Sequence, residues 1–535
     1  MTHELTGSLQ TNTSTEGRAV KRSARIACVG QRHGARLAPW LLTALAGALA
    51  MPAGEAAPSP TSNPSESAAS TSAAPVPPYA HSKVILGMSW DLSTVTSLRT
   101  ANGSDLWPMT WGSDGELYGA WGDGGGFDGD SDSAGRVGLG FARISGVPVA
   151  GSVGSYSGQN IWGAAPNYAQ SPATFGGKVG DLISVHGVLY AHGGLWTASN
   201  CDCSDPIHKP GDNSTERTLA WSRDLGKSWQ IAPWTTSRDL GASLQFGRDY
   251  SGAWDPAHVY LYTQGDRFDD PGHLYLRRVA LGSLTADPAT AGHYQYWAGV
   301  DSNGTPQWSN NASTGRPIFS DPNVKPGTWA NAAVVYDAPL GRYLLTTFHG
   351  TRTGQVGFFE APNPWGPWAT IAYYADWGGY NESGGEANGL SFPSKWISAD
   401  GRSLWGVFSG AGAFDAFNVA GVQFATAPGI PEFLAPVHDT VLKSGDTVNL
   451  RGAGTTLAWS VTLVKEGGPP IARGTGASLS FVVPSNVVAD EIVRVRLTGP
   501  GSSLYRDFRI ATSALPALTL KGVSSDPVAP GSATP

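Results

Sequence analysis

The chain has 535 residues, a formal net charge of −7, and charged residues at only 14% of its positions, against about 25% in ordinary soluble domains. It contains 70 Gly, 20 Trp, 17 Tyr and 17 Phe. This composition excludes a coiled coil, a collagen and a multipass membrane protein, and the absence of a long Lys/Arg run argues against nucleic acid as a partner. Abundant glycine and aromatic residues favour an all-β fold of two or three domains.

Residues 1–56 have the features of a secretory signal peptide. Basic residues precede an apolar run at residues 37–51, and Gly54 and Ala56 supply the small side chains that a signal peptidase reads. The run is short for a bilayer span, and a retained anchor is the alternative. Residues 57–79 are a Ser/Pro/Ala-rich linker that cannot bury a core. We therefore expect a secreted, extracellular protein with no stable membrane insertion after signal cleavage.

A hairpin pattern repeats five times between residues 80 and 427. Each copy has an apolar strand, a turn, a second strand that opens on two apolar or aromatic residues, and a glycine-rich exit. The five pairs are Leu117-Tyr118, Leu189-Tyr190, Val259-Tyr260, Tyr343-Leu344 and Leu404-Trp405. Their mean spacing of about 72 residues leaves room for four strands per copy, as in a propeller blade. A β-sandwich would lack this long period, so the pattern predicts a five-bladed β-propeller over residues 80–427.

A sharper motif lies in the second copy. Residues 222–229, SRDLGKSW, fit the pattern S-x-D-x-G-x-[ST]-W of the Asp-box, which occurs on hairpins of sialidase-like propellers. We expect Asp224 to bond the backbone of its own turn, Gly226 to supply a positive φ, and Trp229 to pack between strands. The motif supports the propeller and indicates nothing about the reaction.

The pattern of apolar and polar residues changes after residue 429. Residues 430–512 alternate apolar and polar side chains between turns, which predicts a small immunoglobulin-like β-sandwich with an accessory role. Residues 513–535 are rich in Pro, Ala and Ser and are predicted to be a disordered tail. We expect the protein to be a monomer.

The first hairpin brings two acidic residues to one end. With a three-residue turn at residues 113–115, antiparallel pairing places Asp105 opposite Asp123 at the open end of the hairpin. Two carboxyl groups in a propeller funnel can cleave a glycosidic bond, because one protonates the leaving oxygen while the other activates water or attacks the anomeric carbon. Trp107 and Trp121 would offer flat faces to sugar rings. The alternative is that both aspartates only cap turns.

The same position in the other hairpins gives further candidates for substrate binding. They lie about twelve residues before each apolar pair, or just after the second strand of a copy: Lys178, Arg248, Asn331, His349 and Asn388. Amide and ammonium groups suit sugar hydroxyls or an anionic group, although a slip of one residue would turn any of them away. Glu382 and Glu386 are reserve acids on a glycine-rich loop, and Asp181 and Asp337 are expected to serve turns.

We expect no cofactor. Residues 128–132, DGDSD, resemble the start of a calcium loop, but Leu139 stands where the glutamate at the twelfth position belongs. A solvated acidic turn is therefore the favoured interpretation over a calcium site. Cys201 and Cys203 are too close for a loop-closing disulfide, and with His208 nearby we favour two free thiols or a strained redox pair over a metal site.

With these residues identified, the chain resembles a family of secreted bacterial five-bladed propellers long described as a domain of unknown function. The runs that carry the resemblance are GSDLWPMTWGSDGELYGAWGDGGGF, RVGLGFARISG, GKVGDLISVHGVLYAHGG, LAWSRDLGKSW and FFEAPNPWGPW. The resemblance covers residues 83–427, whereas the insertion at residues 198–215 and the C-terminal sandwich lie outside it. Some members are endo-D-arabinanases, which cut the D-arabinan of arabinogalactan and lipoarabinomannan with two aspartates at the propeller mouth. The resemblance implies these roles for Asp105 and Asp123.

We therefore expect a secreted glycoside hydrolase that cleaves a polysaccharide, with D-arabinan as the first candidate, by a two-carboxylate acid/base mechanism. A non-catalytic glycan-binding propeller is the alternative from another class. A sialidase would need an arginine cluster and a Tyr–Glu nucleophile pair, and the F/Y-R-I-P signature is missing from this sequence. A polysaccharide lyase with a His/Tyr pair is a further alternative.

Overall fold

The computed structural model describes residues 75–511 except 123, 128–136, 163–175, 197–216, 237–239, 254, 265–271, 303–304, 325–332, 351–353, 380–385, 412–413, 437–439, 465–467, 488–490 and 500–501. The predicted signal peptide, most of the linker and the predicted tail lie outside these residues. The described chain consists of strands and turns with one short α-helix, α1 (Ser93–Ser97), so the all-β prediction is confirmed. None of the helices in this part of the chain is long and apolar enough to cross a membrane.

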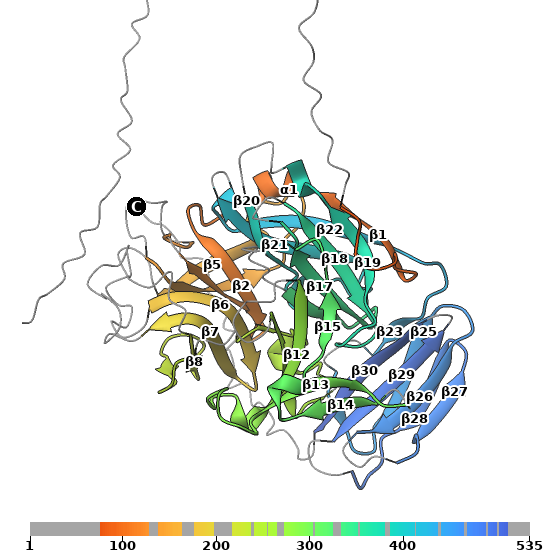
Figure 1. Ribbon diagram of the computed structural model, residues 1–535. Coiled ribbons are helices and arrows are strands. Elements are labelled where there is room, and N and C mark those ends of the chain that lie inside the picture. Colours follow the sequence, from red (N-terminus) through yellow and green to blue (C-terminus); the bar gives the residue numbers. More distant parts are fainter. Residues whose placement is uncertain are drawn as a thin grey trace, which may run out of the picture. The chain divides into compact units, whose positions relative to one another are not determined.

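The described strands between residues 85 and 426 form five antiparallel sheets (Figure 1). Sheets one and two are β2 (Asp105–Trp111), β3 (Leu117–Gly122), β4 (Gly140–Gly146) and β5 (Tyr156–Trp162), then β6 (Gly176–Val185), β7 (Val188–Trp196), β8 (Thr218–Ser222) and β9 (Gln230–Ile231). Sheet three contains β10 (Ala242–Ser243), β11 (His258–Thr263), β12 (His273–Ala280), β13 (Tyr294–Val300), β14 (Pro306–Ser309) and β15 (Pro317–Ser320). Sheets four and five are β16 (Ala333–Asp337), β17 (Arg342–Phe348), β18 (Val356–Ala361) and β19 (Ala369–Tyr374), then β20 (Glu386–Ser391), β21 (Ser403–Ala411), β22 (Asn418–Thr426) and β1 (Ile85–Asp91).

The predicted hairpin repeat is confirmed. In each sheet, leaving aside β1 of sheet five, the two strands that come first in the chain pair antiparallel. These pairs are β2–β3, β6–β7, β10–β11, β16–β17 and β20–β21. The five apolar pairs of the sequence repeat lie in the second strand of these hairpins. Each pair has at least one buried member, because the second strand has sheet neighbours on both sides.

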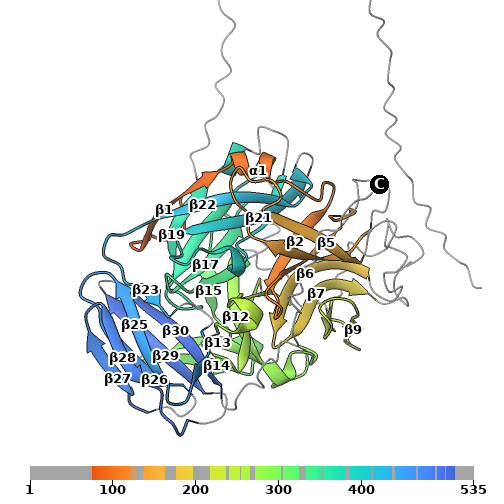
Figure 2. The same ribbon diagram turned by 180° about the vertical axis from the view of Figure 1, so that it is seen from behind.

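The first strands of the five sheets contact one another in a closed cycle: β2 with β6, β6 with β10, β10 with β16, β16 with β20, and β20 with β2. The early strand β1 pairs with β22, with Ile85 opposite Thr426, and so completes sheet five (Figure 2). A closed cycle of antiparallel sheets is what the propeller prediction requires, since the blades of a propeller surround one axis.

The side chain and backbone of Gln245 link first strands of several sheets. Its Oε1 accepts a hydrogen bond from Thr110 Oγ1 of β2 at 3.0 Å, and its Nε2 donates to Leu182 O of β6 at 3.0 Å. Its main-chain N–H donates to Val334 O of β16, and its carbonyl accepts from the Tyr336 N–H. One residue thus joins sheets one, two and four where their first strands meet.

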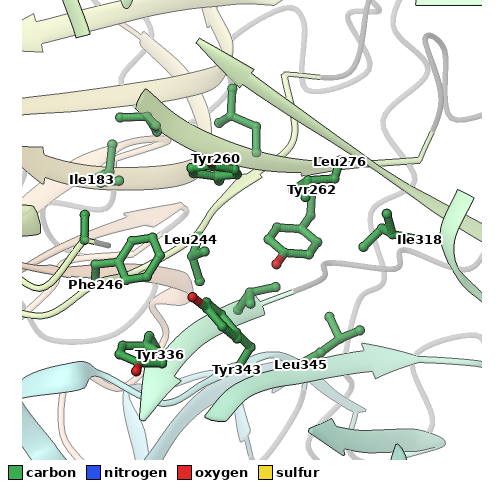
Figure 3. Close-up of a cluster of buried hydrophobic side chains, with 14 of the residues drawn as sticks. Ile183, Leu244, Phe246, Tyr260, Tyr262, Leu276, Ile318, Tyr336, Tyr343 and Leu345 are labelled. Atoms are coloured by element: carbon green, nitrogen blue, oxygen red, sulfur yellow. The ribbon is translucent and has the colours of Figure 1, made fainter. Parts of the chain in front are cut away.

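Apolar side chains fill the space between neighbouring sheets. Figure 3 shows the cluster shared by sheets two, three and four, which includes Ile183 of β6, Tyr260 and Tyr262 of β11, and Tyr343 of β17. Burial of a large apolar side chain is worth about 1.5–3 kcal/mol. This packing therefore holds each sheet against the next independently of the backbone hydrogen bonds within a sheet.

Residues 432–511 form two further sheets around a core of their own. Their strands are β23 (Glu432–Ala435), β25 (Thr447–Ala453) and β28 (Ser478–Val482), and β24 (Leu442–Lys443), β30 (Ser502–Ala511), β29 (Ile492–Gly499), β26 (Ala458–Leu463) and β27 (Ala472–Thr475). The alternation seen in the sequence is real: Val448 and Leu450 of β25 are buried, whereas the residues between and beside them are exposed. The immunoglobulin-like assignment of these sheets stays a prediction.

The three roles expected within residues 222–229 are confirmed. Asp224 Oδ1 accepts from the Ser228 N–H at 2.9 Å, and Gly226 has a φ of 87°. The Trp229 ring packs on Phe141 of β4 with centroids 4.4 Å apart. The turn of sheet two is therefore tied to sheet one by an aromatic contact.

Candidate active site

The structure shifts the predicted pairing of the first hairpin by one residue at its open end. Close to the turn the prediction holds, with Met109 opposite Gly119. At the open end, however, Asp105 lies opposite Gly122 and not opposite Asp123. The predicted direct pairing is therefore wrong, and Asp123 lies outside the described residues.

A β-bulge directly after Asp105 causes this shift. Leu106 and Trp107 have φ angles of 75° and 58°, and the register breaks after Leu106. A non-glycine residue in this region costs of order 1–3 kcal/mol, so other contacts must hold the bulge. The Leu106 N–H donates to Ser409 Oγ at 2.8 Å, and the Trp107 indole N–H donates to Ser104 O at 2.8 Å. Bulges and strained backbone concentrate at functional sites, where they redirect a side chain.

The bulge places Asp105 beside Lys178. A Cβ on Gly122 would lie 2.9 Å from Asp105 Oδ1 and 2.7 Å from Lys178 Cδ, so both side chains occupy the space that this glycine leaves. Asp105 begins β2, and Lys178 is near the start of β6, the neighbouring first strand. Asp105 Oδ1 and Lys178 Nζ are buried atoms, although each residue as a whole is half-buried. Two of the predicted candidates are thus brought together.

Sheet five reaches the same end of the first hairpin. Gly389 of β20 has a φ of 64°, and a Cβ there would lie 2.7 Å from Leu106 O. Only glycine lets β20 approach the bulge this closely. The predicted residue Asn388 directly precedes Gly389 and lies opposite Ser409 in β21. The start of β20 therefore borders the Asp105 segment.

The glycines around position 123 are a packing requirement. Gly122 faces Asp105, and a Cβ on Gly124 would lie 2.2 Å from Gly103 O. Gly124 also has a φ of 134°, which disfavours any other residue. The described chain on both sides of position 123 is thus held against the segment that contains Asp105.

The predicted aromatic platforms are wrong. Trp107 is 0% and Trp121 is 1% exposed. Their ring centroids are 5.6 Å apart, and Trp107 also packs edge-on against Phe417 at 4.9 Å. The Trp121 indole N–H donates to Gly124 O at 3.0 Å. Both rings are therefore buried in the core and present no exposed face to a sugar.

The prediction that Arg248 binds substrate at the same end of the sheets as Asp105 is also wrong. Arg248 Nε donates at 3.1 Å to Ser113 O, in the turn of the first hairpin. This turn is at the far end of the seven-residue strand β2, about 20 Å from the open end. The offset fails because β10 (Ala242–Ser243) is short and the 3₁₀ turn η2 (Arg248–Tyr250) follows it.

His349 has a structural role, so its prediction as a substrate-binding residue is wrong. It is 2% exposed, its Nε2 donates to Tyr374 O at 3.0 Å, and its ring stacks on Tyr373 with centroids 4.0 Å apart. Asn331 and the reserve acid Glu382 lie outside the described residues. Glu386, the other reserve acid, is the first residue of β20.

The two aspartates expected in turns differ in their positions and hydrogen-bond partners. Asp337 accepts from the Leu340 N–H at 3.1 Å within the β16–β17 turn, as predicted. Asp181 is inside strand β6, so the prediction of a turn is wrong for it. Its Oδ1 accepts from the Ser243 N–H at 3.0 Å, and its Oδ2 lies 2.9 Å from His192 Nε2. Sequence reasoning missed this link between sheets two and three, and it missed Ser409, because both depend on contacts between distant segments.

Among the described residues, no group of three or more His, Cys, Asp or Glu side chains could hold a metal ion. The calcium-like run at residues 128–132 and the pair Cys201 and Cys203 lie outside this part of the chain.

Comparisons with known proteins give a partial match. Residues 194–383 match a family described as a domain of unknown function, DUF4185, and no curated protein matches the chain. A GH43_1 enzyme from Xanthomonas citri complexed with xylose is 14% identical over 63% of this chain and 95% of its own, with a TM-score of 0.33. An α-L-arabinofuranosidase from Podospora anserina is 12% identical over 66% and 98%, with a TM-score of 0.32. An exo-β-1,3-galactanase from Phanerochaete chrysosporium is 11% identical over 77% and 95%, with a TM-score of 0.31. Likenesses at this level carry no argument about the reaction.

Proposed function

We propose that this protein is a secreted glycoside hydrolase on a five-bladed propeller, and that Asp105 and Asp123 cleave a glycosidic bond of a polysaccharide. The observation that carries the proposal is the bulge at Leu106 and Trp107 directly after Asp105, at the point where the Asp105 and Lys178 side chains both lie close to Gly122. Strained backbone next to a half-buried carboxyl group is typical of a catalytic position.

Three other described aspartates have a different environment. Asp114 accepts from the Glu116 N–H, Asp224 from the Ser228 N–H and Asp337 from the Leu340 N–H, each within its own turn. Asp105 instead begins the first strand of sheet one, at the open end where the first strands of sheets two and five also lie close. A polysaccharide could reach several sheets at this end.

The proposed mechanism needs two carboxyl groups in different protonation states. One donates its proton to the glycosidic oxygen as the bond to the anomeric carbon breaks. The other, ionised, either takes a proton from the water that attacks this carbon or attacks it directly, and water then releases the sugar. The sequence resemblance of residues 103–127 supports D-arabinan as the substrate, so we propose an endo-D-arabinanase-like activity.

The test incubates the chain from Ala57 onward with arabinogalactan, D-arabinan, L-arabinan and sialylated glycans, and measures new reducing ends and unsaturated products. We expect reducing ends from D-arabinan, and their loss in both Asp105→Asn and Asp123→Asn. Asp114→Asn, at the turn end of the same hairpin, is the matched control that should keep the activity.

Three results would overturn the proposal. Glycan binding without product from any substrate would favour a binding propeller, and an ultraviolet-absorbing product would favour a lyase. Full activity of Asp105→Asn would show that the hydrolytic site lies elsewhere.

A further inference from the structure

Asp105 and Lys178 lie close together, and their proximity bears on a question that the two-carboxylate proposal leaves open, namely which carboxyl group is ionised. Asp105 Oδ1 and Lys178 Nζ are both buried, and a Cβ on Gly122 would lie 2.9 Å from Asp105 Oδ1 and 2.7 Å from Lys178 Cδ. A carboxylate moved out of water is stabilised by a nearby ammonium group, whereas a proton donor gains nothing from one.

We infer that Lys178 is a positioning residue that keeps Asp105 ionised, so that Asp105 is the base or nucleophile of the proposed reaction and not its acid. The inference rests on the proposed function for the word "base", but the effect of Lys178 on the charge of Asp105 does not. In the reaction, Asp105 accepts the proton of the attacking water or forms the bond to the anomeric carbon. The second carboxyl group of the proposed pair then supplies the proton to the leaving oxygen.

The strands around Asp105 contribute different charged groups, and Asp415 is also near this end, where its carbonyl accepts from the Gly103 N–H at 2.6 Å. The sequences of β3, LYGAWG, and β21, SLWGVFSGA, contain none. On the β6–β7 hairpin, Asp181 and His192 lie against each other farther along the strands. Glu386 begins β20, and Asp123 follows β3 in the sequence. Lys178 is therefore the cationic side chain that these strands place near Asp105.

A substitution at Gly122 tests the inference a second way. A methyl group at this position would lie 2.7 Å from Lys178 Cδ and 2.9 Å from both Asp105 Oδ1 and Leu106 Cδ1, so the arrangement of these side chains must change in Gly122→Ala. Gly180 is on the same strand as Lys178, and a Cβ there meets nothing nearer than His192 O at 3.8 Å. Gly180→Ala is thus a matched control in which a methyl group is added without displacing either side chain.

The experiment measures two properties of wild type, Lys178→Met, Lys178→Arg, Gly122→Ala and Gly180→Ala. The first is the acidic limb of the pH profile of kcat/KM for polysaccharide cleavage. The second is the pH dependence of carbodiimide labelling of Asp105 with glycine ethyl ester, read by peptide mass spectrometry. Carbodiimides activate the protonated carboxyl group, so this readout needs no enzymatic activity, and Asp105→Asn is its blank.

We expect both pH dependences to move upward by about one pH unit or more in Lys178→Met, less in Gly122→Ala, and not at all in Gly180→Ala. Lys178→Arg should restore much of the wild-type behaviour, because it keeps the charge. A fall in activity with neither curve moved would overturn the inference and leave Lys178 a packing residue. If wild type cleaves no glycan, the hydrolase proposal fails, while the labelling curves still decide whether Lys178 holds Asp105 ionised.

Discussion

Asp337 provides a quantitative test of how this fold treats a buried acid. It is 0% exposed, its Oδ1 accepts from the Leu340 N–H, and its Oδ2 is buried with no hydrogen-bond partner among the described residues. Burial raises the pKa of Asp337 to about 8, the Leu340 N–H partly offsets this effect, and the nearby Asp400 carboxylate adds to it. The folded protein therefore keeps a proton on Asp337 at neutral pH.

The consequence for stability follows from the difference between folded and unfolded chains. An unfolded aspartate ionises near pH 3.9. Below about pH 4 both states hold the proton, and between about pH 4 and 8 only the folded state does, so the protein loses stability as the pH rises. The loss is about 1.4 kcal/mol per pH unit, or roughly 4 kcal/mol between pH 4 and 7.

Asp337→Asn removes this titration. The amide oxygen can still accept from the Leu340 N–H, and the cost of placing an NH₂ group at the Oδ2 position does not change with pH. The difference in unfolding free energy between variant and wild type should therefore shift by roughly 4 kcal/mol in favour of the variant from pH 4 to pH 7. Urea denaturation of both proteins at one-unit pH intervals measures it, and the comparison cancels all other titrating groups.

Asp224→Asn is the control with the opposite sign. Burial raises the pKa of Asp224, but hydrogen bonds from the Ser228 side chain and backbone more than offset it, and the pKa ends below its usual value. This variant should be less stable than wild type at neutral pH, and the deficit should shrink as the pH falls below about 4. A difference for Asp337→Asn that stays flat from pH 4 to 7 would mean that Asp337 is charged in the fold, and the reasoning would be refuted.

Three further predictions concern the contacts that shape the site. Ser409→Ala removes the acceptor of the Leu106 N–H and should lower the unfolding free energy by about 1–3 kcal/mol, and it should also lower kcat/KM. Ser403→Ala, at an exposed position of the same strand, should change neither quantity. Equal effects of the two substitutions would contradict the role of Ser409 in holding the bulge. Gln245→Ala leaves partners on two strands unsatisfied and should cost about 2–4 kcal/mol, measured by urea denaturation, and unchanged stability would show that this link is dispensable. Trp121→Phe should lower the melting temperature and leave KM unaltered, because the ring is in the core; a raised KM at unchanged stability would contradict its burial.

The hairpin repeat was accessible to sequence analysis because the period of the apolar pairs directly reflects the second strand of each sheet. Around Asp105 the same reasoning failed by one residue. In a sequence, a positive φ angle is normally indicated by a glycine, but here Leu106 and Trp107 adopt positive φ angles. The hydrogen bond that stabilises this backbone is accepted by Ser409, about 300 positions later. A pairing rule based on neighbouring residues cannot predict such a distant hydrogen bond.

The ligand candidates failed for two other physical reasons. Trp107 and Trp121 were expected at the surface because aromatic rings suit sugars, yet large rings are also the best filling for the space between sheets, where both are buried. Arg248 was placed by an offset that assumes a tight turn, and sheet three has the longer connection with η2 instead. Lys178, in a hairpin with a two-residue turn, does lie near Asp105, as the offset predicts, and its role in substrate binding stays a prediction.

The pairing of β1 with β22 has a consequence for the order in which the molecule is assembled. Ile85 belongs to one of the earliest strands in the chain, yet its partner Thr426 follows more than three hundred residues later. Whether the chain emerges from a ribosome or is threaded through a pore, its leading strand stays without its partner until nearly the last sheet has been delivered. The completion of the ring is thus a late event, and an uncommitted strand edge waits for it throughout synthesis.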